Sequence, residues 1–201
     1  MKSIVFATGN PGKTAEIRHL LAPLGIRVIA QSELGIAEAE EPHDNFLDNA
    51  LAKARHASAA ARLPALADDS GLCVDALGGA PGVHSAYYAG RQGSRAERDA
   101  RNNRKLLDEL GGRSDRGAHY VCVLALVRSA DDSQPLVAQA DWHGEIALAP
   151  RGSGGFGYDP FFRLRELGKT AAELDSAQKN LLSHRGQALA KLLELLKGEA
   201  E

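Results

Sequence analysis

The sequence predicts an α/β fold built around a mixed β-sheet. Residues 3–7 are a short run of β-branched and aromatic residues that indicates a buried strand, and apolar residues then recur at helical spacing until Gly25. A second strand is expected at residues 26–30, so strand, helix and strand follow one another as in a parallel sheet. Two longer strands, residues 119–127 and 136–142, flank a polar turn and predict an antiparallel hairpin. Parallel pairing early in the chain and antiparallel pairing later predict one mixed sheet.

Further helices are expected to flank this sheet. The alanine-rich segment 46–62 carries apolar residues at helical spacing, and Asp44 is its expected N-cap. Ser94 and Glu97 form a capping box that begins a charged helix, which a pair of glycines ends. Leucines at helical spacing in residues 187–197 predict a last helix that packs on the sheet.

Composition limits the classes of function. The chain has 201 residues, 44% of them hydrophobic, and we expect one two-lobed domain over residues 1–198 with a frayed tail at residues 199–201. A formal net charge of -2 argues against a binder of nucleic-acid polymers, and no apolar run is long enough to span a membrane. Cys73 and Cys122 lie in apolar runs without a partner at metal-ligand spacing. They predict buried, reduced thiols and a cytoplasmic protein.

The first candidate site is the loop that joins the first strand to the first helix. Backbone N–H groups, a helix N-terminus and one lysine are the groups that bind a polyphosphate. The loop nearly matches the phosphate-loop pattern of NTPases, but Ala7 occupies the position of the required first glycine. A simple tight turn before a helix is the alternative. The candidate substrate contacts are Thr8, Gly9, Asn10, Pro11, Gly12 and Lys13.

A pair of acidic residues forms the second candidate. Asp68 and Asp69 follow a short apolar run and precede Ser70 and a glycine, so we expect them where a strand gives way to a turn. Mg²⁺ takes a small number of carboxylates together with phosphate oxygens and water, and Glu41 is a further acidic candidate. One of the two aspartates could also accept a proton from attacking water. Turn chemistry without catalysis is the alternative.

A glycine-rich segment with two aromatic residues is the third candidate. Residues 152–160 contain four glycines around Phe156 and Tyr158, which suits a backbone that approaches a flat ligand and presents a ring for stacking. Gly157 and Asp159 belong to the same segment. A plain flexible loop is the alternative.

A group of hydrogen-bond donors precedes the last helix. Lys179, His184 and Arg185 could donate to the carbonyl oxygens of a purine but not to its exocyclic amino groups. Such donors provide a physical basis for selecting 6-keto bases. The alternative is a capped helix with ordinary basic residues on its surface.

Taken together, these segments resemble the inosine/xanthosine triphosphate pyrophosphatase family. The resemblance runs nearly end to end, through ATGNPGKTAEI, NFLDNALAKARHA, PALADDSGLCVDALGGAPGVHSAYYAG, GSGGFGYDPFF and SHRGQAL. It implies an α/β fold with an elongated central mixed sheet flanked by helices, and two lobes with a nucleotide cleft between them. It also implies a homodimer that hydrolyses ITP, dITP and XTP with Mg²⁺ to the nucleoside monophosphate and pyrophosphate.

The resemblance also implies roles for the candidate residues. Asp69, with Asp68 beside it, matches the catalytic carboxylates, and Asp69 and Glu41 match the metal ligands. The loop from Thr8 to Lys13 matches the phosphate-binding loop. The further substrate contacts would be Ser70, Phe156, Gly157, Tyr158, Asp159, Lys179, His184 and Arg185.

The chain departs from the family pattern at three positions. Tyr87 stands where the family has an arginine, and His43 and Asn45 replace a glycine and a threonine. Two competing functions stay open. A phosphate-loop ATPase or kinase would release or transfer the γ-phosphate, and a regulatory nucleotide-binding module would bind without turnover.

Overall fold

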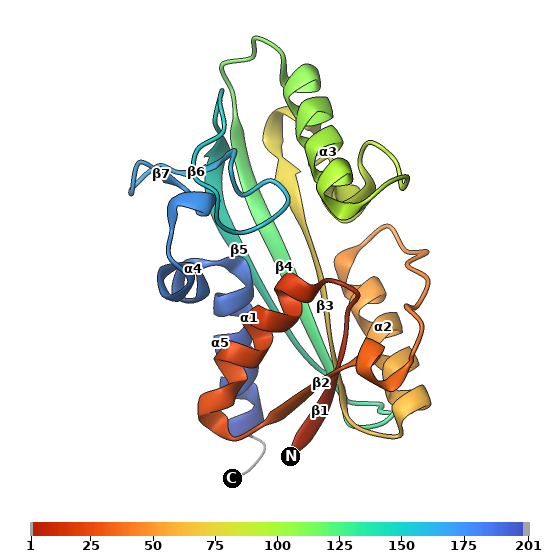
Figure 1. Cartoon of the computed structure of the whole chain (residues 1–201). Coiled ribbons are helices and arrows are strands. Elements are labelled where there is room, and N and C mark those ends of the chain that lie inside the picture. The colour runs from red at the N-terminus through yellow and green to blue at the C-terminus, as the bar shows by residue number, and fades with distance from the viewer. Residues whose placement is uncertain (1, 199–201) are drawn as a thin grey trace. The chain divides into compact units, whose positions relative to one another are not determined.

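The computed structural model describes residues 2–198 and has the predicted α/β architecture (Figure 1). The tail expected at residues 199–201 lies outside the described residues. The strands are β1 (Ser3–Ala7), β2 (Arg27–Ala30), β3 (Ala65–Val74), β4 (Gly117–Val127), β5 (Leu136–Ile146), β6 (Phe162–Leu164) and β7 (Lys169–Thr170). The helices are α1 (Pro11–Leu21), α2 (Phe46–Ala61), α3 (Arg95–Leu110), α4 (Ser176–Leu182) and α5 (His184–Gly198).

The strands form a mixed sheet in the order β2-β1-β3-β4-β5-β6-β7. β1 pairs in parallel with β2 and β3, whereas β6 pairs antiparallel with β5 and β7. The predicted mixed sheet is therefore confirmed. The described chain divides into two compact units. The first comprises residues up to Asp69, Cys122–Ala140 and residues from Arg185 on, and the second comprises Ser70–Val121 and Asp141–His184.

The first unit has a core on each face of its strands. Side chains alternate along a strand, so Ile4 and Phe6 point to one face of β1 while Val5 and Ala7 point to the other. On the first face α1 and α5 pack together over the strands (Figure 1). On the opposite face α2 packs against β1 through small residues. The core cluster of the first face includes Ile4, Phe6, Ile17, Leu21, Leu66, Leu124, Leu189 and Leu192.

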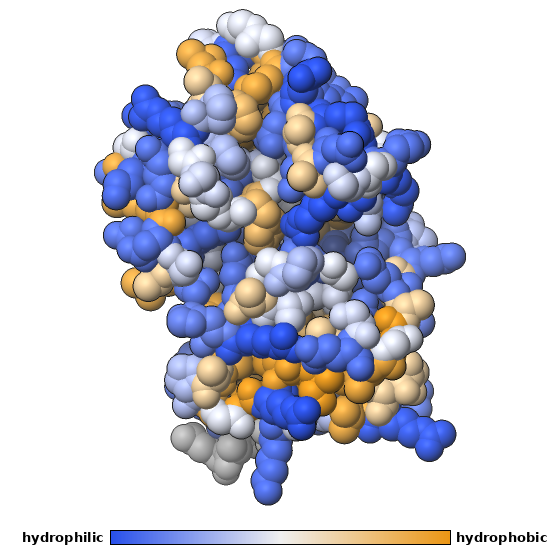
Figure 2. Space-filling view, in the orientation of Figure 1, coloured by the Kyte–Doolittle hydropathy of each residue, from blue (hydrophilic) through white to orange (hydrophobic). Residues whose placement is uncertain are grey.

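The second unit has its own core, in which α3 packs against strand residues. Ser94 and Glu97 form the predicted capping box of α3, which ends before Gly111. The core cluster of this unit includes Leu72, Val74, Leu106, Leu110, Tyr120, Trp142, Tyr158 and Phe162. In Figure 2 hydrophilic residues cover much of the visible surface, and apolar residues gather in the lower part of the view, where β1 and β2 lie. No helix within residues 2–198 is long and apolar enough to cross a membrane.

Two local predictions were wrong. Asn45, not Asp44, caps α2, because its extended backbone directly precedes the helix and its Oδ1 accepts the N–H of Asp48 at 2.8 Å. Asp68 and Asp69 do not lie at a turn but inside the ten-residue strand β3. Turn preference gives way here because both carboxylates are buried and paired with cations. Gly71 is also explained by packing, since an added Cβ would lie 2.2 Å from the carbonyl oxygen of Gly82.

Candidate active site

The loop between β1 and α1 is closed by its own side chains. The Oδ1 atom of Asn10 accepts hydrogen bonds from the N–H groups of Gly12 at 2.9 Å and Lys13 at 3.2 Å. Thr8 Oγ1 accepts the N–H of Asn10 at 3.2 Å, and Pro11, which has no N–H, begins the helix. A phosphate group that bound the amides of Gly12 and Lys13 would therefore replace the side chain of Asn10.

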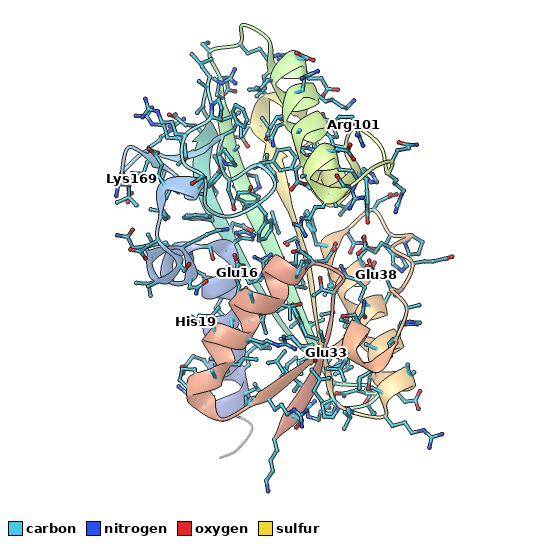
Figure 3. The ribbon with its side chains drawn as sticks, viewed as in Figure 1. Glu16, His19, Glu33, Glu38, Arg101 and Lys169 are labelled. Atoms are coloured by element: carbon cyan, nitrogen blue, oxygen red, sulfur yellow. The ribbon has the colours of Figure 1, made fainter. Side chains whose placement is uncertain are left out.

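Glu38 lies against the exposed glycine of this loop. An added Cβ at Gly9 would lie only 1.7 Å from the Oε1 atom of Glu38, so the carboxylate occupies the space beside the glycine. Glu38, labelled in Figure 3, is exposed, and its carboxylate is at the end of a flexible side chain. A polyphosphate approaching Gly9 would thus meet a negative charge that can move away.

Asp68 is the centre of a buried network of charges. Only 1% of it is exposed. Its Oδ1 atom lies 2.5 Å from Lys13 Nζ, and its Oδ2 atom lies 2.5 Å from Arg185 Nε. Arg185 also pairs with Glu16 of α1, labelled in Figure 3, and the thiol of Cys122 lies 3.4 Å from Asp68 Oδ2. Burial alone would raise the pKa of Asp68, but the charges of Arg185 and Lys13 outweigh it and hold the pKa well below its ordinary value. Asp68 is therefore ionised, and each of its carboxylate oxygens pairs with a cation.

Asp69 has a different environment although it is the next residue. Its Oδ1 accepts a hydrogen bond from Lys53 Nζ at 2.6 Å, and the same ammonium donates to Glu41 Oε1 at 2.8 Å. The Oδ2 atom of Asp69 is buried and has no hydrogen-bond partner within the described part of the chain. Burial raises the pKa of Asp69, and the nearby charges of Lys53 and Lys13 offset this only in part. Two neighbouring carboxylates with pKa values pushed in opposite directions are a typical acid–base arrangement.

Asp69 and Glu41 could also hold a magnesium ion whose remaining ligands a substrate would supply. Within residues 2–198 there is no group of three or more His, Cys, Asp or Glu placed to hold a metal. Mg²⁺ does not need such a group, because one or two carboxylates suffice when phosphate oxygens and water fill the remaining positions. The ammonium of Lys53 already lies between the two carboxylates, and the second oxygen of Asp69 is still available as a ligand.

In the second unit, Asp159 organises the segment that carries Phe156. Only 3% of Asp159 is exposed, and its Oδ2 accepts the N–H of Phe156 at 2.8 Å and a hydrogen bond from Lys179 Nζ at 2.7 Å. Tyr120 donates to the other oxygen at 3.3 Å. Lys179 Nζ also lies 4.7 Å from the centroid of the half-buried Phe156 ring. The structure thus brings Phe156 and Asp159 of one candidate segment together with Lys179 of another.

Tyr158 and His184 lie in the aromatic core of the same unit. The buried Tyr158 donates its hydroxyl to the carbonyl of Ser85 at 2.9 Å. The ring of His184 stacks on Tyr120, with centroids 4.7 Å apart and planes 7° from parallel, and more distantly on Trp142. Tyr120 connects this stack to Asp159 through its hydroxyl.

Most of the glycines around Phe156 have a reason inside the protein. An added Cβ at Gly152 or Gly154 would come within 3.0 Å of the backbone of Ala172. At Gly155 it would lie 2.0 Å from the carboxylate of Asp159, and the backbone there has a positive φ of 71°. The density of glycines therefore reflects close packing of the segment and is not by itself evidence for a ligand.

The three departures from the family pattern have local explanations. Asn45 caps α2, a role that a threonine at the same position could also fill. The backbone N–H and C=O of His43 both bond to the side chain of Asn49, so these bonds do not depend on the side chain at position 43. The ring of Tyr87 carries the guanidinium groups of Arg91 and Arg98 at 4.1 Å and 5.5 Å from its centroid.

The short sequence motifs include neither Lys53 nor the residues of α3 that contact the Phe156 segment. Lys53 shares a face of α2 with Asn49, and both are buried among alanines. A lysine on an otherwise uncharged, buried helix face was the available signal, because a buried ammonium needs a carboxylate partner. On α3 the signal was the spacing of Arg95, Asp99 and Asn103, which puts them on successive turns of one helix face.

The chain is similar to known proteins in sequence and in fold. The model of the Ham1 family matches residues 4–195. A protein of Ralstonia nicotianae named dITP/XTP pyrophosphatase is 64% identical over 98% of this chain and 98% of its own length. One of Nitrosomonas europaea with the same name is 60% identical over 98% of this chain and 95% of its own length. The structure of a HAM1 protein from Coxiella burnetii superposes with a TM-score of 0.88 at 46% identity, covering 98% of this chain and all of that one.

Proposed function

This chain belongs to the Ham1 family, and from that premise we propose that it hydrolyses non-canonical purine nucleoside triphosphates. The substrates would be ITP, dITP and XTP, and the products the nucleoside monophosphate and pyrophosphate. Such a reaction removes deaminated purines from the nucleotide pool. The observation that carries the proposal is the pair of adjacent carboxylates, Asp68 and Asp69. The first lies between two cations, and the second keeps a buried oxygen that has no hydrogen-bond partner among the described residues.

The triphosphate would bind at the loop of the first unit. Lys13 supplies the positive charge, and its ammonium is already aligned by Asp68. The backbone of Gly9, Asn10 and Gly12 would contribute donors once the side chain of Asn10 has released the helix N-terminus, and Thr8 and Pro11 shape the turn.

Asp69 would act as the general base. It accepts a proton from a water molecule, the water oxygen attacks the α-phosphorus, and the bond from that phosphorus to the bridging oxygen breaks, so that pyrophosphate leaves. Its raised pKa suits this task, because a base works best when its pKa approaches the working pH. Asp68 would not take the proton, since Lys13 and Arg185 keep it ionised and occupy both of its oxygens.

Asp69 and Glu41 would hold Mg²⁺. When bound, the ion would supply positive charge that stabilises the pyrophosphate as it leaves. Lys53 lies between these two carboxylates, so it would have to move when the ion binds.

The purine base would be recognised in the second unit. Phe156 offers a partly exposed ring for stacking, and Asp159 and Lys179 fix the segment that carries it. We propose further contacts from Ser70, from the backbone of Gly157 and Tyr158, and from His184. Arg185 was expected to help read the 6-keto group. Its guanidinium pairs with Asp68 and Glu16, so base reading by Arg185 would compete with these ion pairs.

One assay tests the proposal. The purified protein is incubated with dITP, XTP, GTP and ATP in the presence and absence of Mg²⁺, and pyrophosphate and orthophosphate are separated. We expect pyrophosphate and monophosphate from dITP and XTP, only with Mg²⁺, and far slower turnover of ATP. Orthophosphate and a nucleoside diphosphate would instead indicate a phosphate-loop type of NTPase, and binding without turnover would indicate a regulatory module.

We also propose that the chain acts as a homodimer in the cytoplasm. Family resemblance supports the dimer, and the two free cysteines Cys73 and Cys122 support a reducing compartment. A nucleic-acid polymer is not an expected partner, because a formal net charge of -2 gives no overall basic field, and a membrane is not, because no apolar run is long enough to span one. Sedimentation equilibrium of the purified protein would give the mass of the assembly, and a monomer would contradict the dimer.

A further inference from the structure

One face of α3 holds the peptide group on each side of Gly157. Asp99 Oδ2 accepts the N–H of Gly157 at 3.1 Å, and Asn103 Nδ2 donates to the carbonyl oxygen of Gly157 at 2.9 Å. The same Nδ2 donates to the carbonyl of Asp99 at 2.9 Å, which fixes the orientation of the Asn103 side chain. Since Asp159 accepts the N–H of Phe156, both residues of the segment are held through their backbone.

These bonds restrain a position that would otherwise be free to rotate. Gly157 has a positive φ of 63°, and an added Cβ there would meet no described atom within 4 Å, so no side-chain packing at this position holds its backbone. The ring of Phe156 depends on that backbone for its direction. Asp99 and Asn103 therefore help to fix the backbone from which the ring projects.

Two cations lie near the ring of Phe156. Arg95 is one turn before Asp99 on α3, and its guanidinium carbon is 4.8 Å from the ring centroid, while Lys179 Nζ is 4.7 Å from it. Lys179 is fixed by its buried ion pair with Asp159. Arg95 is 35% exposed and its ion pair with Asp99 spans 3.7 Å, so Arg95 is the cation that can leave the ring.

We propose that Asp99 and Asn103 are positioning residues that orient Phe156 for stacking with a purine base, and that Arg95 covers the ring until the base takes its place. The inference rests on the proposed function, because it assumes that a purine is the ligand of this segment. A partly exposed guanidinium on a ring face can exchange for a flat aromatic base, since both favour the same face. The fixed backbone holds the ring in place before the base binds, which reduces the conformational entropy lost on binding.

The positioning role and the covering role predict opposite changes in the Kd for a purine nucleotide. Asp99→Ala and Asn103→Asp remove the acceptor and the donor for Gly157, and we expect the Kd for inosine monophosphate to rise about tenfold, within the range of a lost stacking contact. Asp99→Asn keeps an acceptor oxygen and should restore most of the affinity. Arg95→Ala removes the competing cation and should lower the Kd about twofold to threefold, which corresponds to a weak exposed cation–π contact.

The experiment is a calorimetric titration of each folded variant with inosine monophosphate and, separately, with pyrophosphate. We expect the Kd for pyrophosphate to stay unchanged, because that ligand has no base, and Arg104→Ala, an exposed arginine of the same helix, to change neither Kd. Equal losses for both ligands, or unchanged inosine monophosphate binding in Asn103→Asp, would overturn the positioning role. A higher Kd in Arg95→Ala would overturn the covering role. Turnover of XTP by the unmodified protein is measured alongside, so failure of the proposed function is seen independently.

Discussion

The Nζ atom of Lys13 lies 2.5 Å from the Oδ1 atom of Asp68, in the first unit of the chain. The next residue, Asp69, pairs with a different lysine, Lys53, at 2.6 Å. Successive side chains of a strand point to opposite faces, so β3 presents one carboxylate to α1 and α5 and the other to α2. The two aspartates can therefore have separate tasks, one structural and one chemical.

Asp68→Asn is expected to destabilise the fold. The substitution leaves the buried Arg185 and the ammonium of Lys13 without their shared carboxylate, and breaking a buried ion pair costs about 3–5 kcal/mol. Urea denaturation measures the loss. Asp131→Asn is the matched control, because Asp131 is exposed. A loss below about 1 kcal/mol, the usual size for a surface pair, would show that the network around Asp68 does not stabilise the fold.

Asp69→Asn is expected to act on the reaction more than on the fold. The substitution preserves the shape of the side chain, and Lys53 keeps Glu41 as a partner, but the general base is lost. We expect kcat for XTP to fall by about 10²–10⁴-fold, the usual contribution of such a base. Initial rates give this value, and circular dichroism checks the fold. Activity within tenfold of the unmodified protein would remove Asp69 from the base role.

Local sequence patterns predicted the main elements of the fold because alternation and helical spacing are short-range signals. Asp68 and Asp69 show where this approach fails. Their residue types favour a turn. The cations that pair with Asp68 are far from it along the chain, Lys13 by 55 positions and Arg185 by 117. Only the folded chain brings these cations to Asp68 and lets the strand continue through it.

Those residues of the candidate site that stand in short sequence motifs could be proposed from the sequence. Lys13, Asp69 and Phe156 stand in short motifs whose residue types suit their chemistry. Lys53 and Asn103 stand on helices, and their importance comes from partners elsewhere in the sequence, Asp69 and Gly157. A motif shows what a residue can do, whereas these contacts depend on tertiary structure.

Lys53→Met should make stability depend on magnesium. Without the ammonium, Asp69 and Glu41 lose the cation that pairs with both of them. We expect a loss of about 3 kcal/mol, at the lower end for a broken buried pair because Glu41 is partly exposed. A divalent cation would replace the missing charge, so millimolar Mg²⁺ should raise Tm more in this variant than in the unmodified protein. The control is Lys105→Met, which breaks an exposed pair with Glu109. Equal magnesium shifts in all three proteins would contradict a cation site at these carboxylates.

Glu38→Gln should strengthen binding of the triphosphate. The carboxylate of Glu38 occupies the space beside Gly9, where it would repel an approaching phosphate, and the amide keeps the size of the side chain without the charge. Two unit charges about 4 Å apart in water interact by roughly 1 kcal/mol, so we expect KM for XTP to fall by up to about fivefold. Rates at increasing salt check the cause, because screening should reduce the difference between the two proteins. Glu194→Gln, an exposed change on α5, should leave KM unaltered. If KM rises in Glu38→Gln, the carboxylate assists binding of the triphosphate instead of repelling it.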